Sequence, residues 1–319
     1  MVKKSDLTEW VEGYFYNPSL FQRILSFFLL PLTLLYCLGA YIRRRFCKAK
    51  DYGIAVVSVG NLLVGGSGKT PFVIELAKRY GDCAVILRGY GRKSSGMVVV
   101  SERGQIKTDV KTSGDEAMLI AKSLPQASVI VSEKREDAIG YAKEKGIKVV
   151  FLDDGFGKCH IKKLDILLKP ETDPKNGFCL PSGPYREPKS FEKYAHIVAR
   201  EGEDFRRIVN IENKTENMVL ITAIAKPQRL DRYLPENIEK FYFADHHYFE
   251  KEEIGEIVKK TGVDSILTTQ KDEVKLEKFG FKLSVMRLKM DIDEKILEKV
   301  DKYIKERDAK KDTDSSDPS

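Results

Sequence analysis

Hydrophobic and polar residues follow two periods that alternate along most of the chain. Short apolar runs, bounded by glycine, proline or polar residues, are each followed by a stretch with helical spacing. Such runs are typical of strands buried in a parallel sheet, and their alternation with helices predicts an α/β fold with helices on both faces of the sheet. In the first part of the chain we expect strands at residues 54–59, 83–87, 128–131, 148–152, 165–168 and 195–199, and helices at 72–80, 113–124 and 132–145.

A polar stretch at residues 200–217 precedes a second alternating region. There the pattern predicts strands at residues 218–225, 241–243, 265–269 and 281–290, and helices at 227–234, 250–261 and 294–305. Since 319 residues exceed what one core usually holds, we expect two domains. The expected organisation is an apolar N-terminal segment, a larger domain, a smaller α/β domain and a polar, frayed tail, at residues 1–48, 49–216, 217–307 and 308–319.

Residues 24–42 form an apolar run without a charged side chain, followed directly by Arg43, Arg44 and Arg45. The run is at the threshold length for crossing a bilayer. Three interpretations stay open for this run. The first is a transmembrane helix with its basic end in the cytoplasm, and the second is a helix broken near Pro31 that lies in the membrane interface. The third is a buried core helix. Leucine and aromatic residues on all faces speak against a core helix. Either membrane interpretation leaves the segment that follows on the cytoplasmic side.

The net charge of +7 suits nucleic acid, anionic lipid and phosphate-bearing substrates alike. The sequence has neither a basic–aromatic sheet motif nor zinc-finger spacing, so we expect no nucleic-acid partner. Five cysteines are scattered without a CxxC pair. This pattern predicts neither a disulfide framework nor a zinc site, and a reducing compartment is the simpler interpretation.

A glycine-rich turn after the first predicted strand leads into Lys69, Thr70 and a helical stretch, which is the context of a phosphate-binding loop. Glycines let backbone N–H groups converge on phosphate oxygens, and the helix N-terminus adds partial positive charge. Lys69 would reach the β/γ-phosphates of ATP, and Thr70 would hold Mg²⁺. Leu63 stands where the Walker A pattern has glycine, and an ordinary βα loop is the alternative. The residues expected to bind the nucleotide are Gly65, Gly66, Ser67, Gly68, Lys69 and Thr70.

Two acidic residues, Asp153 and Asp154, follow the strand predicted at residues 148–152. The carboxyl ends of parallel strands meet at the edge of the sheet where ligands bind, so we expect these carboxylates near the phosphate loop. One of them can hold Mg²⁺, directly or through water. The alternative is an ordinary Asp-Gly turn after a strand.

Three further positions each have two interpretations. Asp115 is either a general base or an acid favoured at a helix N-terminus by the macrodipole, and its spacing alone favours the second. Arg186, in a loop rich in Pro and Gly, is either a phosphate clamp or a solvated arginine. His246 and His247 follow a predicted strand, and composition does not decide whether they lie at the surface.

Seven short motifs occur along the chain in the same order as in a known protein family. They are VSVGNLLVGGSGKTP, LRGYGRKSSG, SGDEA, LDDGF, LPSGPYREP, FADHH and LTTQKD, at residues 57–71, 87–96, 113–117, 152–156, 180–188, 243–247 and 267–272. With these motifs the chain resembles the tetraacyldisaccharide 4′-kinase family, the lipid A 4′-kinases. The resemblance extends from the apolar N-terminal segment to at least residue 276.

The resemblance implies an ATP- and Mg²⁺-dependent kinase of lipid A biosynthesis at the cytoplasmic face of the inner membrane. Its substrate would be a tetraacylated glucosamine disaccharide 1-phosphate, phosphorylated on the 4′-hydroxyl to give lipid IVA. The implied fold is a P-loop NTPase-like parallel sheet flanked by helices, with a second, smaller α/β domain, the active site between them, and an N-terminal hydrophobic membrane helix. The other implied partners are lipids of the cytoplasmic membrane.

By position, the resemblance makes Asp115 the general base, paired with His246 from the second domain. This reverses the interpretation that spacing alone favours. Asp153 and Asp154 become the metal acids, beside Lys69 and Thr70 as ATP and Mg²⁺ residues. The positions that match residues near phosphates or substrate are Arg88, Arg135, Arg186 and Glu187.

The chain departs from the family pattern DDGFQH after Phe156. Lys158 stands where a histidine is usual, and His160 lies two residues late. We therefore assign no role to His160, and Lys158 is a candidate cation in its place. Two other functions stay open: a membrane-associated P-loop ATPase or GTPase switch, and a membrane scaffold without activity. The QKD at residues 270–272 lacks the spacer of the guanine motif Asn-Lys-x-Asp, which argues against a GTPase.

Overall fold

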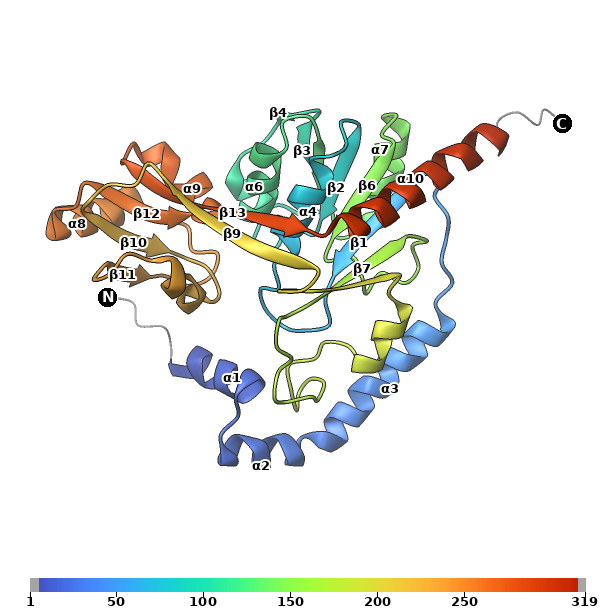
Figure 1. Cartoon of the computed structure of the whole chain (residues 1–319), viewed down its shortest axis with the longest axis horizontal. Helices are drawn as coiled ribbons and strands as arrows, with labels where there is room; N and C mark the ends of the chain where they lie inside the picture. The colour runs from blue at the N-terminus through green and yellow to red at the C-terminus, as the bar shows by residue number, and fades with distance from the viewer. Residues whose placement is uncertain (1–5, 315–319) are drawn as a thin grey trace.

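In the computed structural model, which describes residues 6–314, two β-sheets form the framework of the molecule (Figure 1). The larger sheet has eight strands in the order β4-β3-β5-β2-β6-β1-β7-β8. Strands β3 and β4, which the sequence pattern does not predict, run antiparallel at one edge, and the remaining strands are parallel. The strands are β1 (Ala55–Gly60), β2 (Cys83–Leu87), β3 (Val98–Glu102), β4 (Gln105–Ile106), β5 (Ser128–Val131), β6 (Val149–Asp153), β7 (Leu164–Lys169) and β8 (Ile197–Arg200).

Helices cover both faces of the larger sheet. Residues Val57 and Val59 of β1 pack with three helices on one face, and Val56 packs with another helix on the opposite face. All six residues of β1 are buried, as the continuous apolar run predicts for a central parallel strand. The helices on the first face are α4 (Lys69–Ala77), α6 (Asp115–Ser123) and α10 (Glu294–Asp314), and the helix on the second is α7 (Arg135–Glu144).

The smaller sheet has five strands in the order β11-β10-β12-β13-β9, and only β9 is antiparallel to its neighbour. Ile254 of α8 (Lys251–Thr261) packs on its central strands, and α9 (Gln270–Leu276) follows β12 directly. An α/β fold with a large, mostly parallel sheet is thereby confirmed. The strands are β9 (Phe205–Glu212), β10 (Met218–Thr222), β11 (Glu239–Tyr242), β12 (Ser265–Thr269) and β13 (Leu283–Ile292).

The polar stretch at residues 200–217 is not a loop between domains. Most of it forms β9, which pairs with β13 from Val285 opposite Glu212 to Ile292 opposite Phe205. The sequence hides this strand because it is half exposed, with buried and exposed residues alternating. Phe205 packs in the core of the larger sheet, whereas Val209 packs on the smaller one, so β9 connects the two (Figure 1).

The C-terminal helix also crosses the expected boundaries. Ile296 and Val300 of α10 pack in the core of the larger sheet, although residues 217–307 were expected to form the smaller domain. The tail expected to fray from residue 308 continues as helix to Asp314, and residues 315–319 lie outside the described part. The division between the two sheets therefore falls at neither 216/217 nor 307/308.

Three helices differ from the predicted ones. The helix expected at residues 113–124 is broken at Gly114, whose φ is 86°, so that α5 (Val110–Ser113) precedes α6. The helix expected from residue 132 begins at Arg135. Residues 227–234 form a 3₁₀ helix, η2 (Pro227–Tyr233), in place of an α-helix, and the other 3₁₀ helices are η1 (Lys189–Tyr194) and η3 (Glu277–Phe279).

The N-terminal helices α1 (Asp6–Tyr16), α2 (Leu20–Phe28) and α3 (Leu30–Phe46) lie along one side of the molecule (Figure 1). Helices α2 and α3 meet at a bend of 58°, next to Pro31. Across residues 6–314 no single helix has the length and apolar composition to cross a membrane, but this bent pair together does. The interpretation as a buried core helix is wrong, because side chains such as Leu20, Phe28 and Leu34 are exposed.

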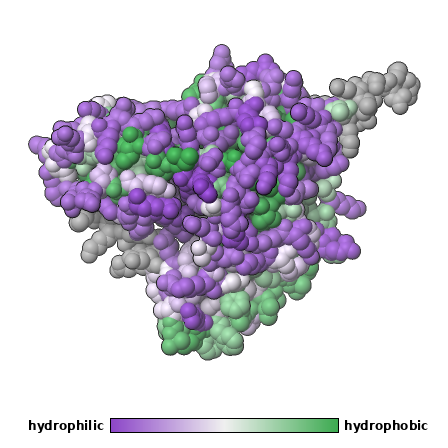
Figure 2. All heavy atoms as spheres, in the orientation of Figure 1, coloured by the Kyte–Doolittle hydropathy of each residue, from purple (hydrophilic) through white to green (hydrophobic). Residues whose placement is uncertain are grey.

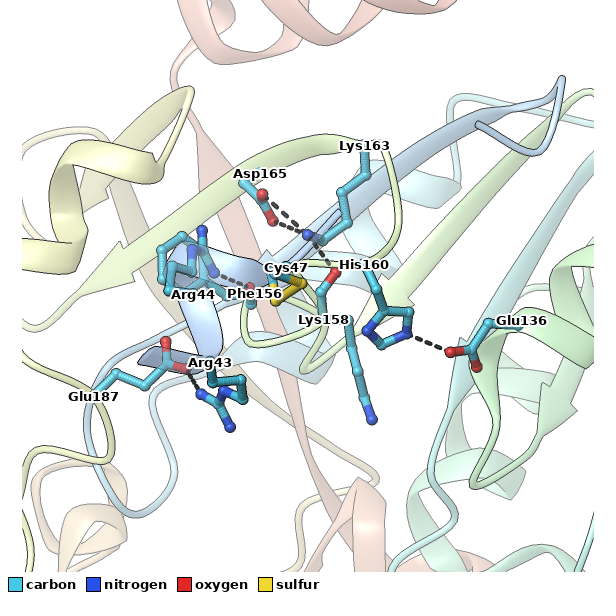
Figure 3. Close-up of a disulfide and its surroundings, with 11 residues drawn as sticks. Arg43, Arg44, Cys47, Glu136, Phe156, Lys158, His160, Lys163, Asp165 and Glu187 are labelled. Carbon is cyan, nitrogen blue, oxygen red and sulfur yellow. Dashed lines mark hydrogen bonds and ion pairs between the residues drawn. A yellow bond between two sulfur atoms is a disulfide. The ribbon is translucent and has the colours of Figure 1, made fainter. Parts of the chain in front are cut away.

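A disulfide joins Cys47, just after α3, to Cys159, in the loop after β6 (Figure 3). The cysteine pattern did not indicate this disulfide, because folding brings together residues that are 112 positions apart. The other cysteines, Cys37, Cys83 and Cys179, are free.

Candidate active site

The loop between β1 and α4 has the backbone of a phosphate-binding site. Gly65 and Gly68 have φ angles of 98° and 80°, which residues with side chains adopt only at a cost. Gly68 immediately precedes α4, so the loop ends at a helix N-terminus, where backbone N–H groups and the helix dipole favour an anion. The backbone at residues 65–68 therefore suits the phosphates predicted for it.

Leu63, the exception to the glycine pattern, has a packing role. Its side chain is buried in an apolar cluster with Phe156 and Phe191, and its backbone forms a β-bridge with Tyr185. Backbone hydrogen bonds of 2.9 and 2.7 Å join residues 62–64 to residues 184–186. Position 63 therefore holds the loop against the Pro- and Gly-rich segment, and the sharp bend lies at Gly65.

Asp153 is the last residue of β6, the neighbour of β1. Its Oδ2 accepts a hydrogen bond from Thr70 Oγ1 at 2.7 Å, whereas its Oδ1 is buried without a hydrogen-bond partner. Burial, with the nearby charge of Glu116, raises the pKa of Asp153 to about 7. A buried, unpaired carboxylate oxygen beside a hydroxyl fits Mg²⁺, which prefers oxygen ligands. Residues 6–314 contain no cluster of three or more His, Cys, Asp or Glu that could hold a metal.

Asp154 is held by two cations. Arg186 donates to its two oxygens at 2.9 and 3.0 Å, and Lys69 Nζ lies 3.5 Å from Oδ1. Burial alone would raise the pKa of Asp154, but Arg186 and Lys69 hold it well below its usual range. Asn61 Oδ1 accepts from Arg186 at 2.6 Å and from Lys69 at 3.2 Å. Arg186 is therefore part of the charged site rather than a solvated loop residue.

The other predicted phosphate or substrate residues lie around this centre. Arg135 is buried at the start of α7, its Nε has no hydrogen-bond partner, and burial lowers its pKa against the charges of Asp153 and Asp154. Arg88 is exposed at the end of β2, within electrostatic range of Arg135. Glu187 points toward α3, where it pairs with Arg43 (Figure 3), and burial raises its pKa.

Figure 3 shows that the ring of His160 points toward Glu136 of α7, whose carboxylate it contacts through Nε2. Lys158 instead points to the same side of the disulfide as Arg43. Burial and the charge of Arg135 lower the pKa of Lys158. His160 therefore interacts with α7, and Lys158 lies within electrostatic range of Arg135 and Arg88.

The second half of the site is a carboxylate–histidine pair between the two sheets. His246 Nδ1 lies 2.9 and 3.1 Å from the two oxygens of Asp115, the first residue of α6. Burial alone would raise the pKa of Asp115, but the His246 hydrogen bond and the charges of Lys271 and Lys275 bring it below its usual value. Burial opposes protonation of His246, and Asp115 outweighs it, so the pKa of His246 is raised. The pair is biased toward carboxylate and imidazolium.

His247 takes no part in this pair, because its Nε2 contacts Glu253 Oε2 at 3.0 Å. The residues that sequence reasoning missed are Asn61, Lys271 and Lys275. Asn61 and Lys271 lie within the VSVGN and LTTQKD motifs. Those motifs indicate the family but do not show what the two side chains contact. Glu116 affects the pKa of Asp153, so the two halves of the site lie within electrostatic range of each other.

A phosphate-binding loop, two acids at the end of the neighbouring strand and a carboxylate–histidine pair within electrostatic range of them define a phosphotransferase of the P-loop class. Residues 25–305 match the family model described as Tetraacyldisaccharide-1-P 4'-kinase, and the chain belongs to this family. The chain is therefore a kinase, and a nucleotide switch is not favoured.

Relatives named tetraacyldisaccharide 4'-kinase match nearly the whole chain. The one from Aliarcobacter butzleri is 53% identical over 92% of this chain and 96% of its own length. One from Helicobacter pylori is 49% identical over 94% and 96%. Among solved structures, LpxK from Aquifex aeolicus in complex with ATP is similar, with a TM-score of 0.74 and 30% identity, covering 88% of this chain and 99% of that one.

Proposed function

We propose that the chain transfers the γ-phosphoryl group of ATP to the 4′-hydroxyl of a tetraacylated glucosamine disaccharide 1-phosphate, with Asp115 as the general base. The observation that carries these roles is the contact of Asp115 with His246 from the other sheet, next to Glu116, which lies within electrostatic range of Asp153. Phosphoryl transfer is mostly positioning and charge neutralisation, and this arrangement supplies both around one carboxylate.

The loop at Gly65, Gly66, Ser67 and Gly68 holds the phosphates through its backbone, and Lys69 neutralises charge on the transferring group. Asp115 orients the attacking hydroxyl and accepts its proton, and His246 holds the carboxylate in place. Arg88, Arg135 and Lys158 supply positive charge for the anionic groups of the two substrates. Since Asp115 and His246 come from different sheets, the base is complete only when these are docked together.

Mg²⁺ fits Asp153, whose unpaired Oδ1 is beside the Thr70 hydroxyl, with Asp154 next to it. When bound, the cation would neutralise charge on the β- and γ-phosphates. A cation at this site would also keep Asp153 ionised at a pH near its raised pKa.

The direct test is transfer of labelled γ-phosphate from ATP to a disaccharide 1-phosphate lipid in detergent micelles. We expect labelled lipid with wild-type protein and Mg²⁺, and none when the 4′-hydroxyl is replaced by hydrogen. ATP binding without labelled lipid would contradict the proposed reaction.

We further propose that α2 and α3 lie in the interface of the cytoplasmic membrane, on its cytoplasmic face, as the partner surface for lipid. Both helices are attached along their length to the segment at 182–190, through Ser26, Thr33 and Tyr41. Their outward sides carry apolar residues that gather at one end of the molecule (Figure 2). A helix fixed to the protein along one side and apolar on the other suits the interface better than a span.

Replacing Leu34, Leu35 and Leu38 together by Ser should lower binding to anionic phospholipid vesicles at least tenfold. These side chains are 68, 67 and 55% exposed, and burial of one leucine contributes about 1.5–3 kcal/mol. Vesicle sedimentation measures the bound fraction, and the melting temperature checks the fold.

The matched control is Met97→Ser with Ile106→Ser, two exposed apolar residues at the opposite edge of the larger sheet. If the leucine variant sediments like the wild type, or the control loses binding equally, α3 is not the membrane surface.

A further inference from the structure

Lys275, on α9, is a buried cation between two carboxylates that belong to different sheets. Its side chain is only 3% exposed. The ammonium lies 2.9 Å from Asp272 Oδ1, on its own helix, and 3.5 Å from Asp115 Oδ2, on α6 of the other unit. A buried charge with two partners links the positions of those partners, because separation from either leaves an ion poorly compensated.

Asp272 holds Lys275 from the side of the smaller sheet. Its Oδ2 accepts hydrogen bonds from Thr222 Oγ1 at 2.7 Å, from Thr269 Oγ1 at 2.9 Å and from the backbone N–H of Ala223 at 3.1 Å. Strands β10 and β12 therefore fix the carboxylate, which fixes the ammonium. The contacts that hold the cation on this side all lie within the smaller unit and do not involve α6.

The other groups facing Asp115 differ from Lys275 in exposure and in partners. Lys271 lies 3.9 Å from Asp115 but divides its charge with Glu116 at 3.5 Å and Asp245 at 3.3 Å. His246 contacts both oxygens of Asp115, and Oδ1 also accepts from the backbone N–H of Glu116 at 2.9 Å. Lys275 is therefore the deeply buried cation on Oδ2, while Oδ1 carries the backbone contact.

We propose that Lys275 is a positioning residue for the transfer reaction, which orients the Asp115 carboxylate and keeps it ionised when the two sheets are docked. This inference rests on the proposed role of Asp115 as base. In the docked arrangement Asp115 gains the cations of α9 and the His246 loop together. If the two sheets moved apart, the Asp115 carboxylate would lose its contacts with Lys275, Lys271 and His246. Docking of the smaller sheet thus completes the base as well as enclosing the reaction.

The lowered pKa of Asp115 agrees with this geometry, since Lys275 is one of the charges that offset its burial. An opposite charge at 4–6 Å or closer lowers a carboxyl pKa by about 1–3 units. A base must be ionised to accept a proton, so its pKa sets the acid side of the rate profile. Loss of Lys275 raises that pKa, and activity is then lost at a higher pH.

The test is Lys275→Gln, which keeps a hydrogen-bond donor for Asp272 and removes the charge. We expect kcat near neutral pH to fall roughly 10- to 100-fold with the KM for ATP within about twofold of wild type. The ratio of variant to wild-type kcat should fall further toward acid pH, with the half-maximal point moved up by about one unit. The control is Lys278→Met, which replaces an exposed lysine three residues later in the chain. This variant should keep the wild-type kcat and the wild-type pH profile.

A second measurement separates positioning from folding. Lys275 lines a cavity of about 460 Å³ between α6 and α9 that opens to solvent. In Lys275→Ala, n-propylammonium replaces the missing atoms of the side chain, and we expect it to restore activity in a saturable way. Ethanol at the same concentration should not.

Distinct outcomes separate the two proposals. A flat kcat ratio across pH, or no rescue by the amine, would overturn the role of Lys275. That role is overturned as well if both variants lose their near-UV circular dichroism and the amine restores neither fold nor activity, since Lys275 is then only structural. Failure of the base itself shows differently: Asp115→Asn would retain most of the wild-type kcat.

Discussion

Lys69→Ala is expected to lower the rate of phosphate transfer by about 10²–10³-fold or more, the range for loss of one pre-placed charged donor. Lys69 begins α4 directly after the glycine loop, and its ammonium lies between Asn61 Oδ1 at 3.2 Å and Asp154 Oδ1 at 3.5 Å. These contacts hold the cation over the loop before ATP arrives. The variant keeps the loop backbone but lacks the charge that offsets the transferring phosphoryl group. Transfer of labelled γ-phosphate to the lipid measures the loss.

Lys78→Ala is the matched control, because Lys78 follows the same helix and its exposed ammonium forms an i,i+3 ion pair with Glu75. It should keep nearly full activity, since such pairs contribute little. If Lys69→Ala were as active as Lys78→Ala, the chain would be a scaffold with a vestigial phosphate loop.

Asp115→Asn is expected to lower kcat by about 10²–10⁴-fold, the usual contribution of general base catalysis, with ATP affinity near that of the wild type. The amide is almost the same size as the carboxylate but cannot accept the hydroxyl proton. The hydrogen bonds and ion pairs of Asp115 in residues 6–314 go to His246, Lys271, Lys275 and Glu116, whereas Lys69 of the phosphate loop contacts Asp154 and Asn61. Steady-state kinetics together with a nucleotide-binding titration separate the two quantities.

The pH dependence of wild-type activity is a second test of Asp115 as the general base. The pKa of Asp115 is held below its usual value, so the acid limit that Asp115 itself imposes on activity should lie below the usual carboxyl range. His246→Gln removes one of the groups that lower this pKa, so its acid limit should move to higher pH. Asp264→Asn, an exposed carboxylate of the smaller sheet, should follow the wild type. A collapse of ATP binding in Asp115→Asn would instead make Asp115 a nucleotide or metal residue.

The phosphate side of the site is local in sequence, and for that reason it was predictable. Continuous apolar runs predict β1 and β6, because a strand covered on both faces needs apolar residues throughout. The glycines and Lys69 lie within one strand–loop–helix unit, so their geometry follows from short-range backbone rules. Asp153 and Asp154 were placed beside them because parallel strands end at the same sheet edge. The motif order then named the family.

The tertiary structure decided what depends on contacts between distant segments. β9 was hidden because its alternating, half-exposed pattern resembles a polar loop until β13 pairs with it. Cys47 and Cys159 look unrelated until α3 lies against the loop after β6, and Leu63 looks irregular until the segment at 184–186 covers it.

Spacing alone made Asp115 a helix-terminal acid, and only the approach of His246 and Lys275 from the other sheet marks it as a base. A carboxylate's chemistry is set by the charges around it, and here those charges lie more than a hundred residues away in the chain. Sequence by itself determined the buried parallel strands, the loop and the family, since these follow from local pattern. The folded chain determined which charges meet, since Coulomb interactions depend on distance in space and not on distance along the sequence.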